Sequence, residues 1–444
     1  MHLTCTTNPF IPVTKQRHLV YALIEIEPEQ TQSPTAPLNL GLIVDASRSM
    51  SIPILSDQQF LELRRKGMAK QVTVDGVTVW QIEVPKHTRV DASSNMDLTK
   101  QALTIVADWL QPTDRFSLVA FAQDALSMVR CLSGAQTSSL HKAIARLAQV
   151  DLGDETYIAR GMHKGIEQMR AALSPQRVNR MLVITDGYTL DEHECYVQTR
   201  EAKKQGIVVS TMGLGLDFNQ ELLISLADVS GGNAYFANEP HEIPDLFRQE
   251  LAQIKSVTWR DLSLSLNLPA DVTLRRVHRV TPTISALNVE NGAINLGDLQ
   301  AAAPPSLLIE LVVPPRPAGS YRLAQLTLHG RAAGGQQTQP LGSENVLVRY
   351  TERTSQTKQN NARLMLAVHQ VSAYKLQNQA LQEADRGNIA GATRRLRLAG
   401  ERLIEMGQTD LGQTMLVEAE LMEKEGQMSV EGTKKLRYGT RKLK

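Results

Sequence analysis

Oxygen-bearing side chains gather where an apolar run of the chain ends. Asp45, Ser47 and Ser49 alternate in the segment DASRSM. Thr156 and Asp186 stand in two later turns, with the sequences GDET and ITDG. Carboxylate and hydroxyl oxygens, with no Cys or His among them, suit a hard cation such as Mg²⁺, with Mn²⁺ and Ca²⁺ as alternatives. Mg²⁺ retains several waters, so such a site would leave a position open to a partner's carboxylate.

These donors need a scaffold that brings three distant loops together. Between residues 37 and 255, short runs that are apolar on both faces alternate with amphipathic helical patterns. This alternation predicts an α/β fold with a doubly wound, mostly parallel sheet. The predicted strands are Leu38–Val44, Phe116–Ala122, Met181–Thr185 and Ile207–Gly213. Since open α/β sheets bind ligands at the carboxyl edge of their strands, we expect the five donors at that edge.

Apolar residues that recur three and four positions apart predict the helices that cover this sheet. One stripe comprises Leu98, Ala102, Ile105 and Trp109, and a second comprises Ile158, Met162, Ile166, Met169 and Leu173. Asp97 is expected to cap the first of these helices, and Pro112 to end it.

Residues 51–94, between the first strand and the first helix, are too many for a simple connection. The stretch 56–69 has a helical pattern. Asp75-Gly76 then separates two alternating β-branched runs, which is a strong signal for a type I′ hairpin. We therefore expect a small helix-plus-hairpin insertion beside the predicted metal site, where it could shape the ligand-binding face.

The chain changes character after residue 255. Residues 256–352 contain alternating strand patterns with Pro- and Gly-rich breaks, which predicts an antiparallel β-sandwich. The N-terminal segment, residues 1–36, contains a further strand-like run, Arg17–Glu27. We expect this run to pair with the sandwich, so that the α/β domain interrupts it. The alternative is that the run caps the edge of the α/β sheet.

Residues 353–444 lack proline and are rich in Ala, Leu, Gln, Arg and Glu, which predicts a C-terminal helical region. Breaks are expected near Gly387, Gly407 and Gly426. The terminal segment is basic, with Glu431 set against Lys434, Lys435, Arg437, Arg441, Lys442 and Lys444. A solvated or frayed tail is favoured over a site for an anionic partner.

Composition excludes several classes of protein. Hydrophobic residues make up 42% of the 444, which excludes global disorder. Lys and Arg number 48 against 46 Asp and Glu, and aromatics are only 4%, so neither nucleic-acid coating nor base stacking is expected. Three scattered cysteines form no CxxC pair. No apolar run approaches the roughly 20 residues of a membrane span, and the first residues lack a signal-peptide core. A cytoplasmic location is expected.

The five donors, in their order, resemble the metal-ion-dependent adhesion site (MIDAS) of the von Willebrand factor A (VWA) family. The similarity covers residues 37–255 and includes the phrase GIVVSTMGLGLDFNQELLISLADVSGGNAYF, which follows the last donor. The resemblance implies that one divalent cation is held by Asp45, Ser47, Ser49, Thr156 and Asp186. The DxSxS motif alone is weak, whereas all five donors in order, each at a strand end, form a strong signal.

Two features depart from the family pattern. Arg48 stands where the family often has Gly, so its long side chain could crowd the site or pair with a nearby acid. The insertion starts immediately after Met50 and could cover or widen the ligand face.

Other motifs give weaker signals. The GLG at 213–215 follows a strand, but it lacks the third glycine of a dinucleotide loop, which favours a tight turn. Asp154 and Glu155 are either acceptors for metal-bound water or solvated loop acids. His193 and Cys195 have no partner cysteine, which favours an exposed helix start over a metal cluster.

These features favour a non-enzymatic module that binds a partner protein when an Asp or Glu of that partner completes the metal coordination. The chain also resembles bacterial cytosolic VWA proteins with a sandwich and a helical tail, whose relatives often act as adaptors beside ATPases, kinases or phosphatases. A scaffold in an assembly or signalling complex is therefore implied. One alternative is a metal-dependent phosphate-ester hydrolase, although no general base or phosphate cradle is visible. The other is a structural scaffold with a vestigial metal site, acting through its basic tail.

Overall fold

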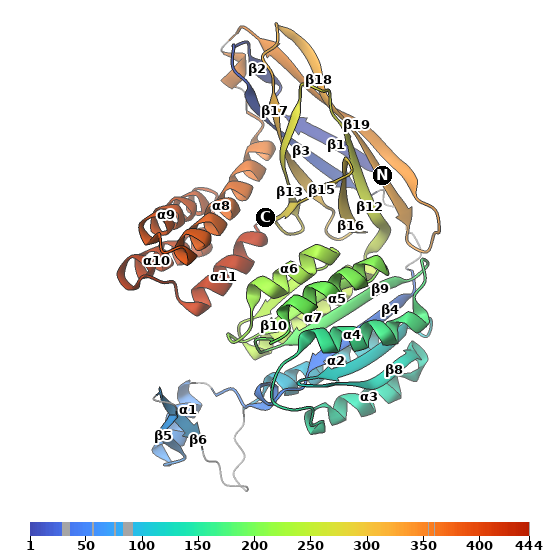
Figure 1. Ribbon diagram of the computed structural model, residues 1–444, viewed down its shortest axis with the longest axis vertical. Helices are drawn as coiled ribbons and strands as arrows, with labels where there is room; N and C mark the ends of the chain where they lie inside the picture. The colour runs from blue at the N-terminus through green and yellow to red at the C-terminus, as the bar shows by residue number, and fades with distance from the viewer. Residues whose placement is uncertain are drawn as a thin grey trace.

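The computed structural model describes residues 1–28, 36–55, 57–74, 77–82, 92–353, 355–358 and 360–443. Within them the chain forms an α/β domain, a β-sandwich and a helical domain, and a small insertion projects from the α/β domain (Figure 1). The C-terminus lies where the three domains meet (Figure 1).

The α/β domain is built on a six-stranded sheet with the order β11-β10-β9-β4-β7-β8. Its strands are β4 (Leu38–Asp45), β7 (Arg115–Phe121), β8 (Ala125–Ser133), β9 (Val178–Thr185), β10 (Val208–Leu214) and β11 (Ala234–Ala237). Neighbouring strands are parallel except β7 and β8, which are antiparallel. The predicted fold class is confirmed. The patterns did not predict β8, because this edge strand is only partly buried and lacks the apolar run of the central strands.

Helices cover both faces of this sheet. One face packs against α2 (Asn95–Trp109), α3 (Thr137–Arg146) and α7 (Ile243–Lys255). The other face packs against α4 (Ile158–Met169), α5 (Glu192–Lys204) and α6 (Gln220–Ser230). Along β4, Leu42 and Val44 belong to the first core while Ile43 belongs to the second. A strand buried on both faces has no polar side to show, which explains the unbroken apolar run.

The start of α2 differs from the sequence expectation. Ser94 is the N-cap, and its hydroxyl accepts from the Asp97 N–H, while the Asp97 carboxylate accepts from the Ser94 N–H. Asp97 therefore completes a capping box and does not itself cap the helix. The predicted apolar stripe holds except at one position. Ala102 is buried in the core, and Leu98 and Trp109 are half-buried against it, whereas Ile105 is half-buried and is not part of that core.

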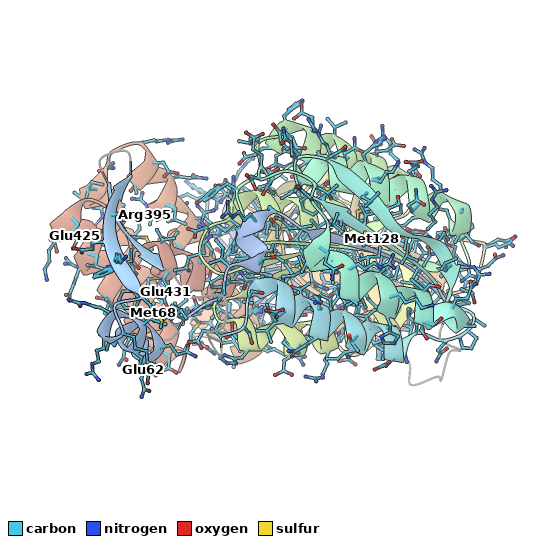
Figure 2. All side chains as sticks on the ribbon, turned by 90° about the horizontal axis from the view of Figure 1, so that it is seen from below. Glu62, Met68, Met128, Arg395, Glu425 and Glu431 are labelled. Carbon is cyan, nitrogen blue, oxygen red and sulfur yellow. The ribbon has the colours of Figure 1, made fainter. Side chains whose placement is uncertain are left out.

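The insertion after β4 contains α1 (Asp57–Arg65) and an antiparallel pair, β5 (Ala69–Val74) and β6 (Val77–Ile82). The predicted Asp75-Gly76 turn lies outside the described residues. Trp80 packs edge-on against Phe60, with 5.3 Å between ring centroids. Glu62 and Met68 of the insertion lie far from Met128 on β8 (Figure 2), and Figure 1 likewise places the insertion away from that edge strand. The insertion therefore stands off the domain with a small core of its own.

Two sheets form the β-sandwich, with the orders β1-β3-β17-β13-β14 and β15-β16-β12-β18-β19-β2. Its strands are β1 (His2–Thr7), β2 (Phe10–Pro12), β3 (His18–Glu27), β12 (Val257–Asn267), β13 (Thr273–Thr281), β14 (Ser285–Leu287), β15 (Val289–Glu290), β16 (Ala293–Gln300), β17 (Ser306–Val313), β18 (Gly319–Ala332) and β19 (Gln339–Thr351). Strand β3 pairs with β17, with Leu23 opposite Leu308. The α/β domain thus enters the chain between β3 and β12 of this sandwich.

The helical domain consists of α8 (Ala362–Asp385), α9 (Ile389–Glu405), α10 (Thr409–Glu425) and α11 (Val430–Arg441). Its apolar core continues onto the outer face of the sandwich, where it includes Leu23, Ile284 and Leu308. Strand β17 is therefore covered on both faces, which explains why it reads SLLIELVV without a polar alternation.

The basic C-terminal segment is not a solvated tail, so the favoured sequence interpretation is wrong here. Helix α11 packs on the α/β domain, and Lys434 and Arg441 are buried. The Lys434 ammonium donates to the Phe218 carbonyl at 2.7 Å, and Arg441 donates twice to the Asp228 carboxylate, at 2.8 and 2.6 Å. The ring of Tyr438 stacks on an aromatic ring of that domain. The charges hold two domains together, which a charge count along the sequence could not reveal.

Six short 3₁₀ helices complete the secondary structure of the described residues. They are η1 (Arg48–Ser51), η2 (Gly134–Gln136), η3 (Leu147–Gln149), η4 (Arg170–Ala172), η5 (Pro240–Glu242) and η6 (Gln356–Lys358). No helix in the described ranges combines the length and the hydropathy that crossing a bilayer requires.

Candidate functional site

Asp45 is the last residue of β4, and its side chain is completely buried. The Ser47 N–H donates to Asp45 Oδ1 at 2.8 Å, and the Thr185 hydroxyl donates to Oδ2 at 2.6 Å. Thr185 ends the adjacent strand β9, and because β4 and β9 are parallel, their carboxyl ends meet. The parallel pairing thus fixes the carboxylate at the edge where the sequence predicted it.

A chain of side-chain hydrogen bonds joins this first loop to the loop after β9. The hydroxyls of Ser47 and Ser49 are 3.0 Å apart, and the Ser49 hydroxyl donates to Asp186 Oδ1 at 2.6 Å. The other oxygen of Asp186 accepts from the amide of Asn95 at 3.1 Å. Four of the five predicted donors therefore form one connected group.

Thr156, the fifth donor, lies beside the turn that follows Asp186. A Cβ placed on Gly187 would be 3.1 Å from Thr156 Oγ1, so glycine leaves the room that this hydroxyl needs. The backbone carbonyl of Thr156 also accepts from the N–H of Leu190 at 3.0 Å and lies 3.1 Å from the hydroxyl of Thr189. These contacts attach the loop before α4 to the loop after β9.

The electrostatics of the two carboxylates follow from their burial. Burial raises the pKa of Asp45 to about 6, although hydrogen bonds from Ser47 and Thr185 oppose the shift. Burial likewise raises the pKa of Asp186, against the effect of the hydrogen bonds from Ser49 and Asn95. The two buried acids thus share this edge with neutral donors, and repulsion from Asp186 and from the exposed Asp217 adds to the upward pKa shifts of Asp45 and Asp186 respectively.

The charged residues around the pair are exposed. Arg48 is exposed and joins none of the ion pairs among the described residues, so it neither fills the site nor neutralises an acid there. Asp154 and Glu155 are exposed as well, and Glu155 accepts from the Tyr157 hydroxyl at 3.1 Å. Of the two readings left open for these acids, the position of Glu155 fits a solvated loop acid.

The weaker motifs are structural. Gly213 lies against the ring of Phe218, since a Cβ there would be 2.3 Å from the ring, and Gly215 has a φ of +67°. These glycines form a tight turn, as the sequence favoured. His193 is exposed near the start of α5, but Cys195 is buried and donates weakly to Asp191. The expected exposed helix start therefore holds for the histidine and is wrong for the cysteine.

Sequence reasoning did not assign roles to three neighbours of the acids. Thr185 and Gly187 flank Asp186 in the ITDG turn, and their alternation with the acid is a signal that could have been used. Asn95 could not have been found in this way, because it lies at the start of α2 and reaches Asp186 only through the fold.

The residues present suit a hard divalent cation. Two carboxylates and three hydroxyls supply only oxygen, the ligand type that Mg²⁺ prefers. Within the described ranges, no three His, Cys, Asp or Glu side chains gather as a metal cluster, and this site has two acids because its other donors are hydroxyls. Two buried acids without a basic partner are what a cation of charge two would balance.

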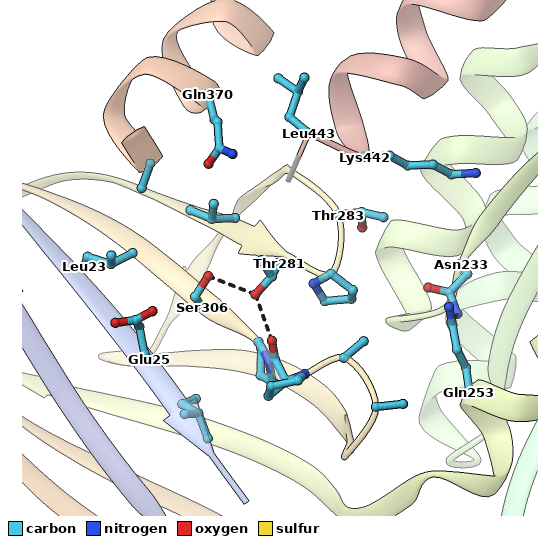
Figure 3. Close-up of a pocket in the computed structure, with 18 of the residues that line it drawn as sticks. Leu23, Glu25, Asn233, Gln253, Thr281, Thr283, Ser306, Gln370, Lys442 and Leu443 are labelled. Carbon is cyan, nitrogen blue, oxygen red and sulfur yellow. Dashed lines mark hydrogen bonds between the residues drawn. The ribbon is translucent and has the colours of Figure 1, made fainter. Parts of the chain in front are cut away.

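A separate cleft of about 550 Å³ lies at the other end of the α/β domain, where it meets the sandwich and α8 (Figure 3). Asn233 and Gln253 line one side, and Thr281 donates to the Pro304 carbonyl at 2.8 Å on the other (Figure 3). The amides and hydroxyls of this lining form a junction between domains, away from the acids at the strand ends.

Family comparisons agree with this architecture. Residues 87–249 match the von Willebrand factor type A domain, and residues 362–444 match the Sll0103-like, C-terminal alpha-helical domain. The first match starts close to the end of the insertion, so β4 and the loop with Asp45, Ser47 and Ser49 precede it. The position of β4 between β7 and β9 places that loop in the same domain.

Individual relatives share parts of the chain or its fold. The uncharacterised protein sll0103 of Synechocystis is 28% identical over 253 residues, which are 54% of this chain and 59% of that protein. The uncharacterised protein YfbK of Escherichia coli is 22% identical over 50% of this chain and 39% of its own length. The chain thus spans about three fifths of the first relative and less of the second.

A solved structure covers the whole architecture. The von Willebrand factor type A protein from Catenulispora acidiphila aligns with 100% of this chain and 96% of its own, with a TM-score of 0.75 and 18% identity. At 18% identity, this structural similarity shows that the two proteins share a fold. The family matches thus identify a VWA domain in this chain, which also carries a β-sandwich and an Sll0103-like C-terminal helical domain.

Proposed function

We propose that this protein binds a partner protein through a divalent cation held at the carboxyl edge of the α/β sheet. The observation that carries the proposal is the pair of buried carboxylates, Asp45 and Asp186, which no Lys or Arg side chain neutralises within the described residues. Burying uncompensated charge is costly. A cation of charge two would offset the two acids.

The residues that would hold the cation are Asp45, Ser47, Ser49, Thr156 and Asp186, and Mg²⁺ is the proposed ion, with Mn²⁺ or Ca²⁺ as alternatives. The bound ion would supply an electrophilic position that an Asp or Glu carboxylate of the partner completes. Thr185 and Asn95 orient the two acids through hydrogen bonds to the oxygens that face away from the serines. VWA domains typically mediate protein binding, which supports this class of function.

The proposal is of a non-enzymatic module. In the described part of the chain, both acids are engaged by hydroxyl, amide or backbone donors, and no His contacts either of them. A general base poised to activate water is therefore not visible in the site. The wider role that the family resemblance suggests is a cytoplasmic scaffold in a bacterial assembly or signalling complex, with ATPase, kinase or phosphatase partners.

The first test measures the cation directly. Isothermal titration of the full chain with Mg²⁺ or Mn²⁺ should give one site, and Asp45→Ala should abolish it. Asp154→Ala is the matched control, because this neighbouring acid is exposed and outside the hydrogen-bonded group. Partner capture from the native cell extract should then depend on Mg²⁺, fail in EDTA and fail with Asp45→Ala. Capture that is equal in all three conditions would contradict the proposal.

A further inference from the structure

Large apolar side chains are exposed in the two loops that carry Ser49 and Asp186. Ile52 and Ile54 follow Ser49 in one loop, and their exposed fractions are 57% and 40%. Tyr188 and Leu190 follow Asp186 in the other loop, with exposed fractions of 60% and 64%. No other large apolar side chain of the described residues is more exposed than Leu190. We call these four residues the apolar rim.

Backbone hydrogen bonds attach the rim to the loops that carry the donors. The Ile52 N–H donates to the Ser49 carbonyl at 3.0 Å, and the Leu190 N–H donates to the Thr156 carbonyl at 3.0 Å. The Ile54 N–H donates to the Ser93 carbonyl at 3.1 Å, next to the N-cap of α2. The backbone of the rim is therefore held in place before any partner arrives, which lowers the entropy cost of ordering these loops on binding.

Neither pair of rim residues belongs to the core of the domain. Met50, between the two serine donors and Ile52, is fully buried, so the chain already places one apolar side chain of this loop inside. The next two apolar residues, Ile52 and Ile54, point outward instead. Thr189, between Tyr188 and Leu190, is buried and donates to the carboxylate of Asp191 at 2.6 Å. In each loop, one residue is thus buried and its apolar neighbours are exposed.

The exposed charges around the rim are of both signs, since Arg48 faces solvent in one loop and the acids Asp154, Glu155 and Asp217 are exposed nearby, so the bound cation is what would attract an acidic occupant. The two carboxylates and a divalent cation sum to zero, so the loaded site would not repel a partner's carboxylate. A carboxylate between apolar side chains matches both the loaded site and the rim, with the charge facing the site and the apolar groups facing the rim.

From this geometry we propose that the partner presents one Asp or Glu flanked by apolar side chains, which pack on Ile52, Ile54, Tyr188 and Leu190. The rim thus distinguishes one acidic loop from another, while the cation attracts the carboxylate that all such loops have. This inference rests on the proposed function, because it assumes that the partner's carboxylate is bound at the cation site.

Two disulfide-closed peptides test the proposal with the full chain. One ring contains Gly-Leu-Asp-Leu-Gly and the other Gly-Ser-Asp-Ser-Gly, and each is titrated in Mg²⁺ and in EDTA. We expect the leucine ring to bind about tenfold more tightly in Mg²⁺, because its side chains bury apolar surface on the rim. The double variant Tyr188→Ser, Leu190→Ser should remove most of that preference and leave the affinity for the serine ring unchanged.

Val417→Ser is the matched control, since Val417 on α10 is 56% exposed and lies in the helical domain. It should keep the tenfold preference. Circular dichroism and melting curves verify that all variants fold, as expected for exposed positions.

The outcomes separate the two proposals. If both rings bind equally and only in Mg²⁺, the cation function stands and the rim proposal is wrong. If neither ring binds in Mg²⁺, the site does not bind acidic loops, and both proposals are wrong. A leucine preference that persists in EDTA would also overturn the rim proposal, because the apolar contact would then act without the carboxylate. Binding of the wild type to phosphatidylcholine vesicles that is lost in the double variant would assign the rim to a lipid surface instead.

Discussion

Strand β9 carries a buried charged side chain near its start, Arg180, and another, Asp186, directly after its end. Arg180 meets the sandwich, and Asp186 meets the loop after β4. The two positions are six residue steps apart along an extended strand, which is roughly 20 Å. The sheet therefore buries charge at both ends of β9. Arg180 lies beside a residue of opposite charge, whereas Asp186 lies beside a residue of the same charge.

At the start of β9, opposite charges are paired. Arg180 lies 3.0 Å from Asp298 of β16, and Arg260 of β12 lies 3.8 Å from the same carboxylate. All three side chains are at most 4% exposed. Arg260 also donates to the carbonyls of Pro175 and Gly206, on the α/β side of the junction. The pairing joins the α/β domain to the sandwich.

At the end of β9, like charges meet. Asp186 and Asp45 share the edge with hydroxyl and amide donors, which hold the carboxylates in place without neutralising them. At the joint a buried carboxylate lies between two arginines of the protein itself, whereas the two acids at the other end have no basic partner among the described residues. The comparison shows that one edge is an internal joint, and it supports the proposal that the other edge holds a cation.

The largest expected effect breaks the joint. Asp298→Ala would leave Arg180 and Arg260 buried without their carboxylate, which should lower the free energy of unfolding by about 3–5 kcal/mol. Urea unfolding followed by the fluorescence of Trp259, close to Arg260 on β12, would measure the loss.

Asp271→Ala is the matched control for this variant. Asp271 pairs with Arg316 at 2.7 Å, but it is 53% exposed, so its loss should cost less than about 1 kcal/mol. Equal losses of unfolding free energy for the two variants would mean that Asp298 contributes no more to stability than an exposed ion pair does.

A smaller effect is expected at the acidic edge, and its sign depends on the cation. Because burial raises the pKa of Asp45, the ionised side chain is costly to the folded chain when no cation is bound. Asp45→Asn should therefore leave the melting temperature in EDTA unchanged or higher.

In Mg²⁺ the order should reverse. Wild-type protein should gain about 2.7 kcal/mol at a Mg²⁺ concentration one hundred times the Kd, while Asp45→Asn gains nothing. Asp154→Asn, at an exposed acid, should behave as wild type. A loss of stability by Asp45→Asn in EDTA would show that the acid acts structurally, as Asp298 does.

The smallest expected effect sharpens the position of the fifth donor. Gly187→Ala would place a methyl group 3.1 Å from Thr156 Oγ1, so the hydroxyl must shift. We expect about fivefold weaker Mn²⁺ binding, measured by the spin resonance of free Mn²⁺, with little change in melting temperature.

Adding Thr156→Ser to that variant removes the threonine methyl group and should restore part of the affinity, because the hydroxyl can then move. Wild-type affinity in Gly187→Ala would place Thr156 outside the cation site.

Much of the α/β domain could be predicted from local patterns. Strands such as β4 are apolar on both faces, and that composition has few explanations other than a central strand between helices. Edge strand β8 escaped prediction because half-buried strands have no such run. The start of α2 was misread because Ser94 and Asp97 both have capping chemistry, and only the backbone conformation decides which one is the cap.

The contacts between domains could not be predicted. Lys434 and Arg441 read as part of a basic tail, yet their partners, Phe218 and Asp228, stand more than two hundred positions earlier in the chain. Burial of a charge depends on a partner brought by the fold, and periodicity along one segment carries no information about it. The same reason explains why Asn95 was not connected with Asp186.

The sequence by itself determined the kinds of chemistry available: oxygen donors in a fixed order, each directly after a strand-like run or in a turn. Those donor types follow from side-chain identity, and their placement at strand ends follows from local periodicity. Only the tertiary structure decided that Ser49 reaches Asp186, that Thr185 supports Asp45, and that no basic side chain of the described residues enters the group. The physical reason is that hydrogen bonding and desolvation depend on distances set by the pairing of β4 with β9, and a linear sequence does not contain these distances.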